Sequence, residues 1–157
     1  MNASEALEIV RMLAVKADDR GMEALSEHEK NIVLPWSARG IIGNGGFKYF
    51  FEGSHPLSDV SQRFRALGLE RVARSCDEVL VALFGHQPEI VGQSEREAGL
   101  GGIDWDRFEA HEDVVFELKW EELLDVIGAY IDRFPEAFAD VRAWVREKEH
   151  AIRKPTS

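Results

Sequence analysis

The stretch IIGNGGFKYFFEGS, from Ile41 to Ser54, places glycines directly before a dense group of aromatic residues. Glycine adopts positive φ without steric cost, and asparagine tolerates it better than most residues. The chain can therefore end one helix and begin another within a few residues. The phenylalanines that follow are spaced i, i+3 and i+4, so they form one buried stripe. The residues of this predicted structural turn are Asn44, Gly45, Gly46, Phe47, Phe50 and Phe51.

A phosphate site is the alternative interpretation of these glycines. Backbone N–H groups at a helix start can cradle an anion. Against a phosphate site, residues 43–46 include no lysine or arginine, and the residues after them are mostly aromatic. We favour a turn that feeds a core, and a ligand pocket beside Gly45 and Gly46 stays open as the alternative.

The segment upstream of the glycines is predicted to be helical. Ser26 and Glu29 stand three residues apart and form a capping box, in which each side chain satisfies a free backbone N–H of the helix start. The helix should cover residues 27–42. Pro35 lies inside it and removes a hydrogen-bond donor, so we expect a kink or a break near residues 31–34.

Helical spacing of apolar residues recurs along the rest of the chain. It predicts helices over residues 4–18, 70–84 and 120–131, and a last helix that opens at Pro135. Residues 114–118 (VVFEL) are the one candidate strand, and an extended connector is the alternative for them.

These patterns together predict an all-α fold. We expect a compact single-domain bundle of about seven to eight helices that covers residues 1–157. The glycine-rich residues 99–102 should form a linker. The basic tail, residues 150–157, should be frayed.

The net charge argues against direct nucleic-acid binding. Aspartate and glutamate total 29 against 19 lysines and arginines, which gives a formal net charge of −10. Such a chain repels phosphate, and it suits a partner with a basic surface. Solubility is the alternative explanation of the acidity.

We expect a cytoplasmic protein. Residues 1–15 are typical of an amphipathic helix and not of a signal peptide, and the longest apolar run, residues 79–84, is too short to span a bilayer. The single cysteine, Cys76, excludes an internal disulfide.

No pattern of side chains points to catalysis, a metal or a cofactor. The five histidines show no recognised ligand spacing. Cys76 lies on an apolar helical face, where a buried thiol is expected. Glu52 and Asp59, on either side of the turn after the aromatics, are the first carboxylate pair to inspect for acid–base chemistry. We expect that the protein is not an enzyme.

Much of the negative charge is concentrated in one segment, residues 104–125. Nine acids stand there against two bases, Arg107 and Lys119. Glu121 and Asp125 are four residues apart on the polar side of a predicted helix, about 6 Å along its axis. We predict that this segment binds a partner. The candidate residues are Asp104, Asp106, Glu109, Glu112, Asp113, Glu117, Glu121, Glu122 and Asp125.

Three segments resemble the DNA-mimic protein family, a domain of unknown function with an Asn-Gly-Gly-Phe signature. SEHEKNIVLPWSARGIIGNGGFKYFFEGS is similar to the capped helix, the signature and the aromatic cluster of that family. SQRFRALGLERVARSCDEVLVALFG is similar to its next two helices, and FELKWEELLDVIGAYIDRFPEAF to its closing segment. The resemblance spans about Ser26 to Phe138.

The resemblance implies an all-helical fold and, often, a homodimer. In the characterised member it implies an acidic surface that imitates the phosphates of DNA and occupies the DNA-binding face of a transcription regulator. Duplex DNA carries about one charge per 1.7 Å of axis, and fixed carboxylates can present a comparable pattern to a basic face.

We therefore expect a non-enzymatic acidic binding protein that acts as a DNA mimic on a basic DNA-binding protein, with no direct contact to nucleic acid or membrane. One alternative is an immunity or antitoxin-like inhibitor of a basic nuclease, because the surface physics is the same. A second alternative is a small hydrolase or ligand-binding module that uses a pocket near Gly45 and Gly46.

Overall fold

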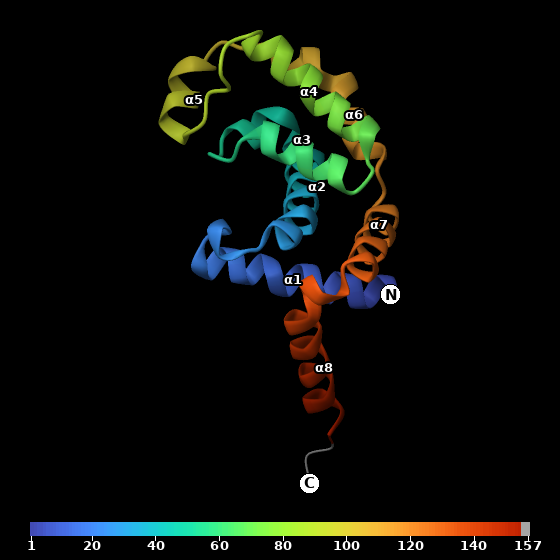
Figure 1. Ribbon diagram of the computed structural model, residues 1–157. Coiled ribbons are helices and arrows are strands. Elements are labelled where there is room, and N and C mark those ends of the chain that lie inside the picture. Colours follow the sequence, from blue (N-terminus) through green and yellow to red (C-terminus); the bar gives the residue numbers. More distant parts are fainter. Residues whose placement is uncertain (155–157) are drawn as a thin grey trace. The chain divides into compact units, whose positions relative to one another are not determined.

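The computed structural model describes residues 1–154, and these residues are helical almost throughout (Figure 1). Eight α-helices and three short 3-10 helices contain the regular structure of the described residues, which include no strand. The predicted all-α fold and its number of helices are therefore confirmed. The elements are α1 (Ala3–Arg20), η1 (Met22–Ala24), α2 (Glu27–Phe51), α3 (Leu57–Ala66), α4 (Glu70–Phe84), α5 (Gln93–Gly99), η2 (Trp105–Phe108), α6 (Glu109–Glu117), α7 (Trp120–Arg133), η3 (Pro135–Phe138) and α8 (Ala139–Arg153).

The backbone contacts divide the chain into two compact units. The terminal unit contains Met1–Val33 and Trp120–Ser157, and the central unit contains Leu34–Lys119. Helix α2 begins in the first and ends in the second. The assignment of the whole chain to one domain stays a prediction.

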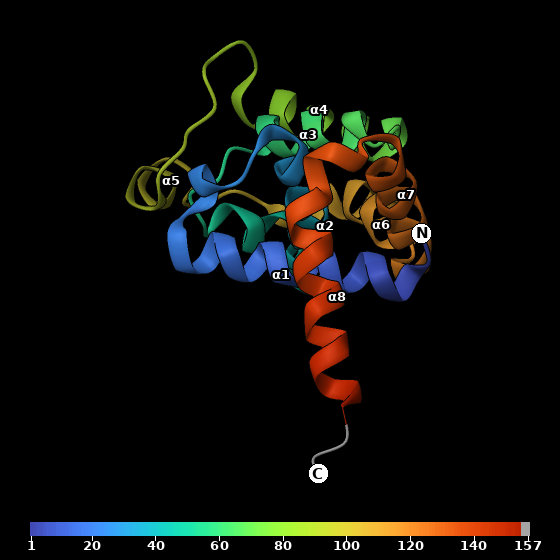
Figure 2. The same ribbon diagram turned by 60° about the horizontal axis from the view of Figure 1, so that its bottom comes forward.

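The terminal unit is built around α1. Helices α7 and α8 both pack against α1, and Figure 2 shows α8 crossing it. The contacts bury apolar side chains that recur at helical spacing, such as Ile9 and Leu13 on α1 and Ile127 and Ile131 on α7. The hydrophobic stripe predicted for residues 120–131 is therefore a core face.

A polar cluster fastens the start of α2 to α7 within this unit. The Tyr130 hydroxyl accepts a hydrogen bond from Nδ2 of Asn31 at 2.8 Å and lies 2.7 Å from Nδ1 of His28. The His28 ring also packs on Phe134, with ring centroids 4.4 Å apart. Each buried polar atom of Tyr130 thus has a partner, which a largely buried hydroxyl requires.

The predicted capping box at the start of α2 is confirmed. The backbone N–H of Glu29 donates to the Ser26 hydroxyl at 3.2 Å, and the backbone N–H of Ser26 donates to the Glu29 carboxylate at 2.8 Å. Lys16 also lies 3.4 Å from this carboxylate.

The break predicted near residues 31–34 is wrong. Backbone angles inside α2 are non-helical only at Gly46, with φ 70° and ψ −170°. Pro35 is accommodated in a buried stretch, where Val33 and Leu34 on its N-terminal side lose nearly all contact with solvent. Burial of these side chains offsets the lost hydrogen bond, while glycine alone enters the left-handed region freely.

The central unit packs α4 against α3 and α6 (Figure 1). Phe64 on α3, Val79 on α4 and Val115 on α6 are fully buried. On the exposed side, Arg65 joins the two helices: its guanidinium donates to Asp77 at 2.8 Å and to Glu70 at 3.0 Å. These hydrogen bonds raise the pKa of Arg65, with Asp77 contributing most.

The strand or extended connector predicted for residues 114–118 is wrong for residues 114–117, because α6 runs through Glu117, and only Leu118 after it has extended backbone angles. Val115 and Leu118 are buried, while Phe116 is 55 % exposed. The short apolar run therefore includes residues that face the core and one aromatic ring that faces solvent. Periodicity over five residues could not separate these cases.

The last helix differs slightly from its prediction. Pro135 opens the 3-10 helix η3, and α8 follows it. α8 includes residues 150–153 of the predicted basic tail, and the end of that tail, residues 155–157, lies outside the described residues. Over residues 1–154, none of the helices has the length and apolar character needed to cross a membrane.

Candidate functional site

The nine candidate acids are divided between the two units. Six belong to the central unit and three, on α7, to the terminal unit. All but Glu112 are exposed. The central set is Asp104, Asp106, Glu109, Glu112, Asp113 and Glu117, and the terminal set is Glu121, Glu122 and Asp125.

Four of the central acids form a row along η2 and α6, which we call the α6 row: Asp106, Glu109, Asp113 and Glu117. Their spacing of three or four residues places them on one side of the helix, about 5–6 Å apart along the axis. Glu117 forms an ion pair with Arg71 at 2.8 Å. Among the described residues, the other three make no ion pair. The row is therefore mostly uncompensated charge.

Two central acids serve the backbone instead. The Asp104 carboxylate accepts a hydrogen bond from the backbone N–H of Asp106 at 3.1 Å and caps η2. The Glu112 carboxylate accepts from the backbone N–H of Phe47 at 3.0 Å. Glu112 therefore caps the helical segment that restarts after Gly46.

Gly46 and Glu112 fit together closely. A Cβ added at Gly46 would lie 2.3 Å from a Glu112 carboxylate oxygen, a separation that two such atoms cannot adopt. The positive φ and the close approach both require glycine here. The glycine turn is thus an internal contact with α6, and the backbone N–H of Phe47 that follows it already donates to the Glu112 carboxylate.

The aromatic residues after the turn enter the core of the central unit. Phe47, Phe50 and Phe51 are buried, whereas Tyr49 is 49 % exposed. Phe47 meets Phe108 edge to face, with centroids 6.5 Å apart. Asn44 and Gly45 are exposed. This arrangement agrees with a turn that feeds a core.

The α7 acids form the second set, which we call the α7 cluster. Glu121, Glu122 and Asp125 are exposed, and within the described chain none of their side chains has an ion-pair or hydrogen-bond partner. Three charges stand within five residues. Their mutual repulsion is tolerated at a cost of a few tenths of a kcal/mol per pair.

Of the groups considered for catalysis, Asp59 is ion-paired and Cys76 is buried. Asp59 pairs with His55 at 2.9 Å and with Arg63 at 3.0 Å, whereas Glu52 lines a pocket to which Asp59 does not contribute. Burial raises the pKa of the Cys76 thiol to about 12, so the reactive thiolate is disfavoured. Residues 1–154 contain no group of three or more ligand side chains that could hold a metal.

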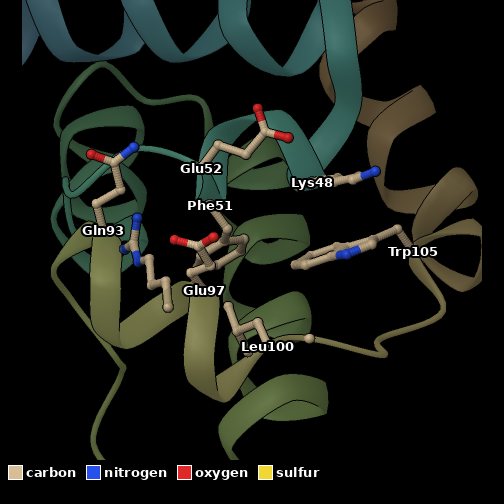
Figure 3. A pocket seen from close by; sticks show the side chains of 9 residues that line it. Lys48, Phe51, Glu52, Gln93, Glu97, Leu100 and Trp105 are labelled. Atoms are coloured by element: carbon tan, nitrogen blue, oxygen red, sulfur yellow. The ribbon is translucent and has the colours of Figure 1, made fainter.

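The central unit contains a pocket of about 430 Å³ next to the aromatic stripe, which we call the Trp105 pocket. Figure 3 shows Lys48 from α2 and Glu52 from the turn directly after it, together with Glu97 from α5 and Trp105 from η2. Trp105 stacks on Phe51, with centroids 5.7 Å apart. The full lining is Lys48, Phe51, Glu52, Gln93, Arg96, Glu97, Leu100, Gly101 and Trp105.

One wall of this pocket is held by a buried arginine. Arg96 is 1 % exposed and donates to the carbonyls of Ile90, Gly53 and His55 at 2.7–2.8 Å. Glu89 lies 3.3 Å from its guanidinium, which balances the buried charge. Burial lowers the pKa of Arg96.

Glu89 in turn caps α3. Its carboxylate accepts from the backbone N–H groups of Leu57 at 2.5 Å and Ser58 at 3.1 Å. A negative group at a helix N-terminus is favoured by the helix dipole. The sequence did not reveal the roles of Glu89 and Arg96, because both look like ordinary charged residues of the weak helix that residues 88–98 suggest.

The comparison with protein-family models decides the family. A model described as DMP19-like protein matches residues 23–147, most of the chain. The chain belongs to the DMP19-like protein family. No curated protein and no solved structure matched it.

DMP19-like proteins are a DNA-mimic family, so the resemblance seen in the sequence is confirmed at the level of the family. The match does not test the Asn44–Phe47 signature. The matched residues include all nine candidate acids, which lie between residues 104 and 125.

Proposed function

We propose that this DMP19-like protein is a non-enzymatic DNA mimic that occupies the DNA-binding face of a basic protein such as a transcription regulator. The carrying observation is the uncompensated charge of the α6 row. Asp106, Glu109 and Asp113 are exposed, regularly spaced and without cationic partners among the described residues.

The spacing can be compared with DNA. One strand presents a phosphate about every 3.4 Å of axis, and both together one about every 1.7 Å. The α6 row offers one carboxylate about every 6 Å, roughly half the density of a single strand. The row alone is therefore too sparse to imitate a duplex.

The α7 cluster adds a denser set. Glu121, Glu122 and Asp125 place three charges within about 6 Å of helix axis, between the densities of one DNA strand and of both. A basic groove reader that meets the α7 cluster would encounter a charge density close to that of the DNA it normally binds. Such a surface also speeds association through electrostatic steering.

Capture and competition test this proposal. The protein is immobilised, proteins from its native lysate are bound at low salt, and duplex DNA is added. A mimic should release its partner when DNA competes, and binding should weaken steeply as salt rises. Captured proteins that stay bound when duplex DNA is added would contradict mimicry. A captured nuclease that loses activity would instead favour the immunity-protein alternative.

Variants locate the surface. We expect Glu109→Gln/Asp113→Asn on the α6 row, and Glu121→Gln/Glu122→Gln/Asp125→Asn on the α7 cluster, each to weaken partner binding without unfolding the protein. Two controls neutralise exposed acids elsewhere. Glu147→Gln/Glu149→Gln on α8 removes two charges, as the α6-row variant does. The same pair with Asp18→Asn added removes three, as the α7-cluster variant does. Equal affinities for test and control variants would reject these surfaces.

The homodimer implied by the resemblance remains part of the proposal. Light scattering of the purified protein, at several concentrations, measures its mass directly against the 17.8 kDa of one chain.

A further inference from the structure

The Trp105 pocket has the size of a small-ligand site. Its volume of about 430 Å³ lies within the range of small-molecule pockets, about 300–1,000 Å³. All its lining residues belong to the central unit. It is independent of the α6 row, because none of the row's acids lines it.

The charges that face the pocket favour a cation. Glu52 and Glu97 are exposed and, over residues 1–154, form no ion pair. Lys48 is the single uncommitted cation of the lining. Arg96 is unable to attract an anion, because its guanidinium is buried against three carbonyls and Glu89. The pocket therefore has one negative charge in excess.

The remaining wall is apolar and aromatic. Phe51 and Leu100 are buried, and Trp105 is half-buried against the Phe51 ring. An aliphatic stem would gain from contact with this wall. A cation beside an indole gains further from the negative face of the ring, for which tryptophan is the strongest of the aromatic residues.

Carboxylates next to an aromatic wall match one ligand chemistry. We propose that the Trp105 pocket binds an alkyl guanidinium or alkyl ammonium group, with Glu52 and Glu97 receiving the charged head and Trp105 contacting the stem. The source of this group is either a free small cation or a basic side chain of a protein.

Two probes distinguish these sources. Agmatine supplies the guanidinium as a free small molecule, and N-acetyl-arginine amide supplies it between two peptide-like bonds. Each is titrated at low salt into ¹⁵N-labelled protein, and the indole N–H signal of Trp105 is followed by NMR. Trp105→Phe identifies this signal among those of the four tryptophans. Binding of both probes indicates access for a protein side chain, and binding of agmatine alone indicates a free cation.

The variants give opposite expected signs. Glu52→Gln and Glu97→Gln should each weaken binding about tenfold, the effect of losing one charge-assisted hydrogen bond. Lys48→Met should tighten binding severalfold, because it removes a repulsive charge. Glu149→Gln on α8 neutralises an exposed acid far along the chain and should leave the affinity unchanged.

Three results would overturn the inference: no shift of the Trp105 signal with either probe, unchanged affinity in both carboxylate variants while they stay folded by circular dichroism, or saturable binding of inorganic phosphate that Lys48→Met abolishes. None of these results bears on the α6 row. A failure here therefore leaves the proposed DNA mimicry standing, and a failure of mimicry leaves this pocket standing.

Discussion

The Glu112 carboxylate accepts a hydrogen bond from the backbone N–H of Phe47 at 3.0 Å, across 65 residues of sequence. This contact holds α6 against the point where α2 restarts after Gly46. It joins the acidic segment and the glycine turn, which appear unrelated in the sequence.

Glu112→Ala should therefore destabilise the protein by about 1 kcal/mol, the usual cost of losing a helix N-cap. Glu112→Gln should cost less, because its amide oxygen still accepts the hydrogen bond. Urea denaturation measures both. Asp113→Ala, at an exposed neighbour without a partner among the described residues, is the matched control and should change stability by less than about 0.5 kcal/mol. Equal losses of stability in the Glu112→Ala and Asp113→Ala variants would show that the cap does not stabilise the protein.

Gly46→Ala should be more damaging than Glu112→Ala. The new side chain meets both the positive φ of 70° and the Glu112 carboxylate. We expect a loss of more than about 1 kcal/mol from backbone strain alone. The double variant Gly46→Ala/Glu112→Ala should recover part of the steric cost, and a thermodynamic cycle from denaturation curves measures this coupling. Strictly additive losses would argue against the close contact.

Phe47→Ala should cost about 3–5 kcal/mol, as expected for a phenylalanine with no exposed surface. Tyr49→Ala, two residues away and half exposed, should cost far less. Denaturation curves compare the two. A Phe47→Ala protein that keeps its stability would show that the aromatic stripe is not a core and would reopen the ligand interpretation of the turn.

Arg96→Met should also destabilise the protein strongly, by about 3–5 kcal/mol, because it leaves Glu89 without its buried partner and three carbonyls without donors. Arg74→Met changes an exposed arginine and serves as the control. Hydrogen exchange should show the loss first at the start of α3, which Glu89 caps. Uniform loss of protection over the whole chain would contradict a local stabilising role of the Arg96–Glu89 pair.

The buried thiol gives a pH dependence whose sign follows from its pKa. Burial raises the pKa of Cys76 to about 12 from an ordinary 9.0. The stabilising effect of the protonated thiol is complete below pH 9 and is lost as the pH rises toward 12, by at most about 1.4 kcal/mol per pH unit. Between pH 9 and 11 the wild type should therefore lose stability faster than Cys76→Ala. Parallel curves for the two proteins would contradict the shift.

The sequence predicted the helices whose signals are local. Helix α4 has the predicted bounds, 70–84, because its apolar residues recur regularly and Gly85, with φ 59°, ends it. The capping box of Ser26 and Glu29 was equally local. The interruption of α2 was predicted near Pro35 and lies at Gly46. Its position depends on tertiary packing around Pro35 and on the Glu112 carboxylate, 65 residues from Phe47.

The candidate site was predictable as a charged segment and not as a geometry. Sequence counting identified the acids of residues 104–125, yet it could not separate Glu112 from its exposed neighbours, because the helix that contains them was not predicted and its end, residues 114–117, was predicted to be a strand or connector. The Trp105 pocket was invisible for a similar reason. Its carboxylates come from the turn after α2 and from α5, and no pattern in either segment indicates the other.

Under the proposed mimicry, the carboxylates of helix α6 are subject to two different selective pressures. At position 112 the side-chain length matters, because the oxygen must reach one particular amide, so drift from glutamate to aspartate should be disfavoured in relatives. Under the proposed mimicry, only the charge at 109 and 113 matters to a basic partner, so aspartate and glutamate should interchange freely. Relatives that exchange their partner should therefore diverge at the outward positions while retaining glutamate at 112.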